Sequence, residues 1–271
     1  MLGQNDGEPR ILGSAGRKLM NISIRVSFPE DGKYDWFKAL QRIESIGSVE
    51  TAFYLPQAFL KNVRIEEVLL PFNKIRVKCG SIHMAHVRID DPFLFEAVLK
   101  KTIEIARVLK CDKIVVHPSF AKLEKVKIYI DEIISPMLEK NLIYLCWETF
   151  SGKRRFLSGL GEAADFCASR KWHKVCFDFS HIHDQQEKIL NDIDKYLDLI
   201  KIFHVSNRIT GQKLQHLPLF YNGADLDFHQ IIRYLKSRGF SGGIVLEYLP
   251  EYHHYLAIDA KNIIEKYGRG E

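Results

Sequence analysis

Short runs of β-branched and aromatic residues alternate along the chain with longer amphipathic stretches. Eight runs have the composition and length of β-strands, and a stretch with helical spacing follows each of them. This order is typical of βαβ units that build a parallel sheet. The eight predicted strands are residues 21–28, 49–55, 77–84, 113–118, 142–149, 175–180, 200–206 and 243–249.

The clearest predicted helix begins at Asp91 and Pro92, a capping residue followed by the residue favoured at the first helical position, and runs to Lys110. Its apolar stripe consists of Leu94, Val98, Ile105 and Leu109. Eight strand and helix units without a long linker predict a single closed (β/α)₈ barrel, the TIM barrel. An open doubly wound sheet is the weaker alternative, because no GxGxxG motif follows the first strand.

Length and composition agree with one barrel. The 271 residues are 46% hydrophobic and 27% charged, which excludes disordered, collagen-like and coiled-coil classes. No apolar run approaches the roughly 20 residues that span a bilayer, so we expect no membrane partner. Residues 1–19 are rich in glycine and polar groups and are expected to be a flexible extension. The barrel would then occupy residues 20–271, with Met20 as a candidate natural start.

The five cysteines form no CxxC pair and are odd in number. They are therefore expected to be reduced and mostly buried, which favours a cytoplasmic location. The net charge of +5 is compatible with an anionic small molecule or with nucleic acid and decides nothing between them.

Residues of the types that bind metals stand where the predicted strands end. The carboxyl ends of barrel strands form one face, so these side chains are expected to converge on one pocket. Period-2 alternation supports this: Tyr144, Cys146 and Glu148 share one face of their strand. The residues at or just beyond the strand ends are His83, His117, Glu148, Asp178, His181, His204 and Glu247.

Taken singly, such a histidine is more often a hydrogen-bonded structural residue than a ligand. The set as a whole points to a metal. Three carboxylates buried in one pocket would repel one another unless a cation compensated them or they kept their protons. Oxygen and nitrogen donors without thiolate suit Mn²⁺, Zn²⁺, Co²⁺ or Mg²⁺.

These residues lie in the motifs SIHMAH, VVHPS, CWETF, FDFSH, FHVSN, QHLPL followed by NGADLDF, and VLEYLP. In this order, from about Met20 to the C-terminus, the motifs resemble the xylose isomerase-like TIM-barrel superfamily. That superfamily includes sugar and sugar-phosphate isomerases and epimerases together with the family 2 AP endonucleases. The resemblance implies a divalent ion held by Glu148, Asp178, His204 and Glu247.

For the endonucleases the resemblance implies two further ions. The second would lie near His83, His117 and the bridging Glu148, and the third near His181 and His216. The chain departs from the endonuclease pattern at Leu214, where an aspartate is expected, and at residues 222–224, where Asn-Gly-Ala replaces a GxG. Asp225 or Asp227 could help to complete the third site. Ultraviolet-damage endonucleases of the superfamily resemble this version, with histidines alone at the third site.

Two enzymatic functions therefore remain open, and the first is a sugar or sugar-phosphate isomerase or epimerase that works by proton transfer through an enediolate. The resemblance implies that Glu148 and Glu247 exchange the proton on opposite sides of the substrate while Asp178 and His204 hold the ion. His181 would contact a substrate hydroxyl, and Arg208 an oxygen or a phosphate.

The alternative is a metal-dependent endonuclease of the AP or ultraviolet-damage type, with nucleic acid as its partner. The basic run Lys153-Arg154-Arg155 would suit phosphate contacts. The remaining loops are short, which favours the small-molecule substrate. A degenerate barrel that only binds a ligand is a third possibility, and the intact quartet argues against it. Many relatives form dimers or tetramers, so a homo-oligomer is also possible.

The other histidines are expected to be structural. His86 and His183 lie near the predicted site without matching a ligand position. Those expected on or near helices are His173, His229, His253 and His254.

Overall fold

The computed structural model describes residues 20–30, 35–151, 157 and 159–268. The predicted N-terminal extension and the basic run 153–155 lie outside these residues. Within them, eight parallel strands close into a barrel in the order β1-β10-β7-β6-β5-β4-β3-β2. The predicted single TIM barrel is therefore confirmed, and closure excludes the open sheet.

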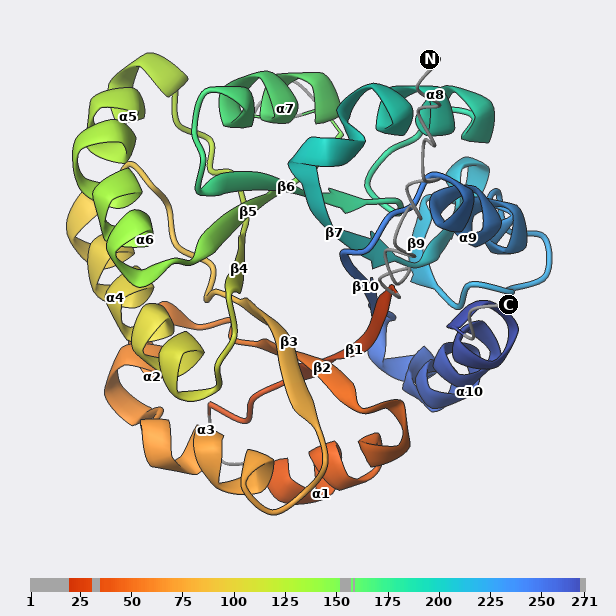
Figure 1. The fold of residues 1–271 in the computed structure, drawn as a ribbon, viewed down its shortest axis with the longest axis horizontal. Helices are drawn as coiled ribbons and strands as arrows, with labels where there is room; N and C mark the ends of the chain where they lie inside the picture. The colour runs from red at the N-terminus through yellow and green to blue at the C-terminus, as the bar shows by residue number, and fades with distance from the viewer. Residues whose placement is uncertain (1–19, 31–34, 152–156, 158, 269–271) are drawn as a thin grey trace, which may run out of the picture.

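The eight barrel strands correspond to the eight predicted runs, with ends shifted by up to three residues. Helices surround them on the outside (Figure 1). The barrel strands are β1 Asn21–Ser27, β2 Ser48–Ala52, β3 Lys78–His83, β4 Lys113–Val116, β5 Tyr144–Glu148, β6 His173–Asp178, β7 Ile200–Val205 and β10 Gly243–Leu246. Between β7 and the next helix, β8 Asn207–Ile209 and β9 Leu214–Leu217 form a small antiparallel sheet.

The helices cover the outer face of the barrel, and none in the described part of the chain is long and apolar enough to cross a membrane. A π-helical turn, Ile130–Ile134, joins α5 to α6. The α-helices are α1 Trp36–Gln41, α2 Pro56–Asn62, α3 Ile65–Phe72, α4 Pro92–Val108, α5 Leu123–Tyr129, α6 Ser135–Asn141, α7 Leu160–Ala168, α8 Gln186–Tyr196, α9 Phe228–Ser237 and α10 His253–Ile263.

Helix α4 forms where the capping signal predicts it. The Asp91 side chain accepts a hydrogen bond from Leu94 N at 3.2 Å, and Pro92 occupies the first turn, where it needs no N–H partner. The helix ends at Val108, and Lys110 then adopts a left-handed conformation with φ 54°. Val98 and Ile105, on the predicted apolar stripe, are fully buried against the barrel.

The core has two parts because barrel strands alternate between an outer and an inner face. The large outer part packs the strands against the helices. The smaller inner part fills the barrel and consists of Val115, Cys146, Cys176, Ile202 and Val245, with Tyr144 packed against it. All five cysteines are free and buried, as the sequence predicts. The inner packing fills the barrel below the carboxyl ends, so the polar residues at those ends lie above an apolar layer.

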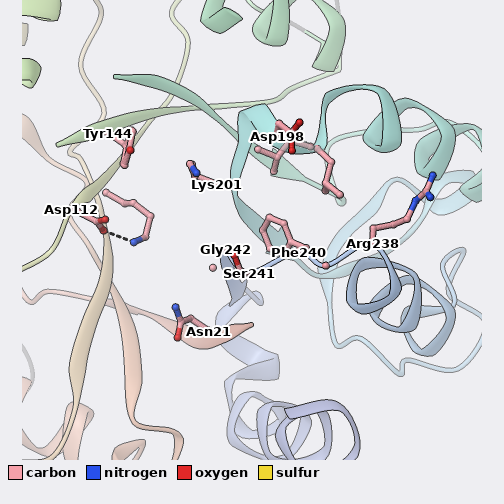
Figure 2. A pocket seen from close by; sticks show the side chains of 14 residues that line it. Asn21, Asp112, Tyr144, Asp198, Lys201, Arg238, Phe240, Ser241 and Gly242 are labelled. Atoms are coloured by element: carbon pink, nitrogen blue, oxygen red, sulfur yellow. Dashed lines mark hydrogen bonds and ion pairs between the residues drawn. The ribbon is translucent and has the colours of Figure 1, made fainter. Parts of the chain in front are cut away.

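The amino ends of the strands surround a separate cavity of about 890 Å³ (Figure 2). Asp112 and Tyr144 lie on one side of this cavity, and Asp198 and Arg238 on the other. Its remaining lining comes largely from β7 and the segment that leads into β10. The cavity and the predicted ligands therefore lie at opposite ends of the barrel.

Candidate metal centre

Four predicted ligands come together at the carboxyl ends of β5, β6, β7 and β10. Asp178 and His204 are cross-strand partners, and Val245, two residues before Glu247, also pairs with His204. His204 Nδ1 lies 3.5 Å from Glu148 Oε2, 4.0 Å from Asp178 Oδ2 and 3.4 Å from Glu247 Oε2. One ring nitrogen therefore faces three carboxylates, a donor set that suits a divalent cation.

Two of these carboxylates have an oxygen without a partner. Asp178 Oδ1 accepts hydrogen bonds from Ser180 N at 2.7 Å and Ser180 Oγ at 2.8 Å. Among the described residues, the buried Asp178 Oδ2 and Glu247 Oε2 have no hydrogen-bond partner. A buried oxygen without a hydrogen bond costs free energy, and these two lie 4.0 and 3.4 Å from His204 Nδ1. A cation among them would supply the missing partner, so the residues fit a metal ion.

Glu148 links this quartet to a second group of ligands. Its Oε2 lies 3.1 Å from His83 Nε2 and 3.2 Å from His117 Nε2, in addition to its approach to His204. His86 joins this group, because one ring nitrogen from each of His83, His86 and His117 lies within 4.8 Å of the others. Glu148 thus contacts both groups of ligands, and His86 is closer to the ligands than the sequence indicates.

A third group lies on the other side of the quartet. His181 Nε2 is 3.4 Å from Asp178 Oδ2 and 3.2 Å from His216 Nε2. His216 lies on β9 in a left-handed conformation with φ 53°, an unusual backbone state for a residue other than glycine. Asp178, a member of the quartet, therefore also supplies the carboxylate of the third group. In the endonuclease pattern an aspartate at the position of Leu214 contributes to that group.

Neither Asp225 nor Asp227 completes the third group of ligands as expected, because both side chains make hydrogen bonds elsewhere. Asp225 Oδ2 accepts hydrogen bonds from Thr210 N at 2.9 Å and Thr210 Oγ1 at 2.6 Å. Asp227 caps α9 by accepting a hydrogen bond from Gln230 N at 3.1 Å. Each carboxylate thus stabilises local backbone.

Arg208 does not have the free guanidinium that a substrate contact would need. The residue is only 1% exposed. Its Nη1 donates to Phe179 O at 2.9 Å and its Nη2 to Asp184 O at 2.7 Å. These bonds tie together the loops after β6 and β7, so we assign Arg208 a structural role. Lys153, the other predicted substrate contact, lies outside the described residues.

Two further predictions concern histidines. His173 is the first residue of β6 and not part of a helix, whereas His229 lies on α9 and both His253 and His254 on α10. His183 is exposed and belongs to none of the ligand groups found among the described residues.

Sequence reasoning missed two buried charges on the first two strands. Arg25 on β1 pairs in register with Glu50 on β2, and Arg25 Nε donates to Glu50 Oε1 at 2.8 Å. Arg25 Nη1 also donates to Glu247 Oε1, and its Nη2 lies 3.1 Å from His204 Nδ1. The alternation was a usable signal, because Ile22, Ile24 and Val26 flank Arg25 on the opposite face. A charge at an inward position inside a strand marks a polar barrel interior.

Burial and charge set the protonation of the ligands. Burial alone would raise the pKa of Glu148, but His117 and His204 outweigh it and hold that pKa well below its ordinary value. Burial lowers the pKa of His83 well below its ordinary value, which leaves the ring neutral with a lone pair. Burial raises the pKa of the nearby Cys176 thiol to about 12, so it stays protonated and is a poor ligand.

Comparison with known proteins identifies the family of the chain. Residues 90–266 match the family described as xylose isomerase-like TIM barrel, and the chain belongs to that family. Over 295 residues the chain is 24% identical to the probable endonuclease 4 of Shouchella clausii (strain KSM-K16), covering 91% of this chain and 99% of that protein.

Two solved structures illustrate the same fold. One is a D-tagatose 3-epimerase-like protein, with a TM-score of 0.70 at 15% identity over 92% of this chain and 97% of that one. The other is a xylose isomerase-like TIM barrel protein from Mycobacterium smegmatis in complex with magnesium, with a TM-score of 0.69 at 17% identity over 91% and 96%. The superfamily is one of metal-dependent enzymes that includes epimerases, isomerases and endonucleases.

Proposed function

We propose that this protein is a metal-dependent phosphodiesterase that cleaves the backbone of damaged DNA, in the manner of the family 2 AP endonucleases. The observation that carries the proposal is the sharing of two carboxylates. Glu148 contacts His83 and His117 on one side, and Asp178 contacts His181 on the other, with His204 between them. The ligands thus form one continuous row suited to adjacent ions.

Adjacent ions suit phosphodiester cleavage better than proton transfer. When bound, they would stabilise the attacking and leaving oxygens of a displacement at phosphorus and lower the pKa of a water. A sugar isomerase needs only the quartet. The similarity to the probable endonuclease 4, which extends over nearly the whole length of that protein, supports the same choice.

The protein's own residues would orient and shield the site. Ser180 fixes one oxygen of Asp178 so that the other stays turned toward His204 and His181. The Phe150 ring lies edge-on between two histidines, with centroids 4.9 Å from His117 and 4.3 Å from His181. This buried apolar ring therefore packs against one histidine from each of the outer ligand groups.

A sugar or sugar-phosphate isomerase or epimerase is the second candidate. Leu214 favours it, because a leucine in place of the aspartate of the endonuclease pattern leaves the third group of ligands with one carboxylate fewer. The accessibility of the proposed bases weighs against it. The side chain of Glu247 is 17% exposed, but that of Glu148 is only 2% exposed and is surrounded by histidines. A base that must reach a substrate carbon needs more access than Glu148 has.

Three measurements separate the candidates. A duplex with a single abasic site, incubated with the Mn²⁺- or Zn²⁺-loaded protein, is expected to be nicked. Elemental analysis is expected to give two or three ions per chain. Deuterium uptake from solvent into a ketose or its phosphate, with one ion per chain and an intact duplex, would instead establish the isomerase.

A further inference from the structure

The two ring nitrogens of His204 face different carboxylates, while Arg25 Nη2 lies beside the ring, 3.1 Å from Nδ1 and 3.2 Å from Nε2. Nδ1 faces the carboxylates of the quartet. Nε2 points to the opposite side, 3.2 Å from Glu50 Oε1 and 3.3 Å from Glu50 Oε2. Glu50 lies on β2, and nothing in the quartet or the two outer ligand groups includes it. The ring is therefore held between the ligand side of the site and a carboxylate behind it.

We propose that Glu50 is a positioning residue of the metal centre. Its carboxylate accepts the Nε2–H of His204, and this fixes the tautomer in which the Nδ1 lone pair is free to bind a divalent cation. A histidine ligand commonly donates its other N–H in this way to a carboxylate, which sets the ring orientation and raises the basicity of the ligating nitrogen.

Glu50 is itself held rigidly. Arg25 Nε donates to Oε1 at 2.8 Å from β1, and Ser81 Oγ donates to Oε2 at 2.6 Å from β3. The Glu50 side chain is completely buried. Because each oxygen has a donor from a neighbouring strand, the carboxylate can turn only if the barrel wall is disrupted. This rigidity is what a residue that orients a ligand requires.

The ion pair with Arg25 indicates that Glu50 positions His204 and is not itself a metal ligand. The guanidinium neutralises Glu50 from within the protein, so Glu50 does not depend on an ion for its counter-charge. From β1 the same guanidinium also donates to Glu247 Oε1, just after the neighbouring strand β10. This leaves Glu247 Oε2 turned toward His204 Nδ1. Arg25 and Glu50 therefore hold two ligands of the quartet, His204 and Glu247, in the orientation that a cation would require.

The test is metal binding without any substrate. It rests on the metal centre of the proposed function and not on the identity of the substrate. Metal-free wild type, Glu50→Gln and Asp259→Asn are titrated with Mn²⁺ and with Zn²⁺ by calorimetry. Asp259 is a matched control, because it is also a buried carboxylate and accepts a hydrogen bond from Tyr248 at 2.7 Å. Thermal unfolding of the metal-free proteins establishes that each variant is folded.

Glu50→Gln is expected to weaken binding of the quartet ion about 10- to 100-fold, because an amide can donate as well as accept and no longer selects one tautomer. Asp259→Asn is expected to bind as wild type does. In ¹⁵N-histidine spectra of the Zn²⁺-loaded protein, His204 should carry its proton on Nε2 in wild type, and the resonance of that N–H should shift in Glu50→Gln, because the carboxylate acceptor is lost.

Wild-type affinity in Glu50→Gln with an unchanged resonance of the His204 Nε2–H would overturn the proposal while leaving the metal centre intact. Failure of wild type to bind any ion would instead remove the proposed function as well. If Glu50→Gln does not fold, Ser81→Ala keeps the charge of Glu50 and removes one of its supports. A severalfold loss of affinity is then expected, and wild-type affinity in this variant would reject the role of Glu50.

Discussion

The two ends of the barrel use polar residues in opposite ways. At the amino end, two lysines beside the large cavity have close partners: Lys113 pairs with Asp112, and Lys201 lies over the Tyr144 ring, 5.5 Å from its centroid. At the carboxyl end, Glu148, Asp178 and Glu247 converge, and among the described residues two of their buried oxygens have no hydrogen-bond partner. The end with the unsatisfied oxygens is where we expect chemistry.

Strand β6 contains this contrast within six residues. Its first residue, His173, is buried with both nitrogens engaged: Trp147 Nε1 donates to Nδ1 at 3.1 Å, and Ser135 Oγ lies 2.9 Å from Nε2. Its last residue, Asp178, has an unpartnered oxygen that faces His181 and His204. A histidine or an aspartate in a barrel strand is therefore informative only when its remaining partners are known.

Removal of the bridging carboxylate should have the largest effect. Glu148→Gln is expected to lower the rate of abasic-site cleavage roughly 10³-fold, the scale of losing a group that supports charge in the transition state. Ion content should fall in the same protein, measured by elemental analysis. Lys201→Gln at the amino end is the control and should nick the duplex at the wild-type rate. Full activity in Glu148→Gln would contradict the site itself.

The stability that buried His173 gives to the amino end should depend on pH. Burial lowers the pKa of His173 to about 4, whereas an unfolded histidine has a pKa of about 6.5. Between these values the unfolded state binds a proton that the folded state does not. Stability is therefore complete above about pH 6.5 and falls as the pH drops toward 4, by about 3 kcal/mol in total.

Urea unfolding of the metal-free protein between pH 4.5 and 7.5 measures this loss. His173→Gln is less stable at neutral pH but should show a flatter dependence over the same range. An equal slope in the variant and in wild type would assign the pH dependence to other groups.

Metal removal should have a smaller effect on stability, confined to the carboxyl end. An ion present at about 100 times its dissociation constant adds about 2.7 kcal/mol to the free energy of unfolding. For a chain of this size, chelation should then lower Tm by about 5–10 °C. Glu148→Gln should respond less to chelation than wild type, and Lys201→Gln should respond fully. Calorimetric scans with and without EDTA make the comparison.

The smallest effect is expected from Lys201→Gln itself. A half-buried cation over an aromatic ring contributes about 0.5–2 kcal/mol, so the free energy of unfolding should fall by no more than that. Urea unfolding at neutral pH measures the change. A loss of several kcal/mol would show that the amino-end cavity depends on this lysine far more than its contacts indicate.

Much of this architecture was readable in the sequence, because hydrophobic alternation defines strands and the carboxyl ends of parallel strands meet. That reasoning predicted all eight strands and brought Glu148, Asp178, His204 and Glu247 to one pocket. It missed Arg25, because it considered polar residues at the ends of strands and Arg25 lies inside a strand. It also missed the sharing of Asp178 between two groups of ligands, because sharing depends on side-chain direction and not on spacing. The small β8–β9 sheet was not predicted either, because strands of three and four residues show little periodicity.

The position of Asp178 between His204 and His181 ties the quartet to the third group of ligands. Because one carboxylate serves both groups, a replacement of Asp178 should disturb the two together, whereas a replacement of Leu214 on β9 should leave the quartet unchanged. The edge of the site can therefore be redesigned separately from its centre.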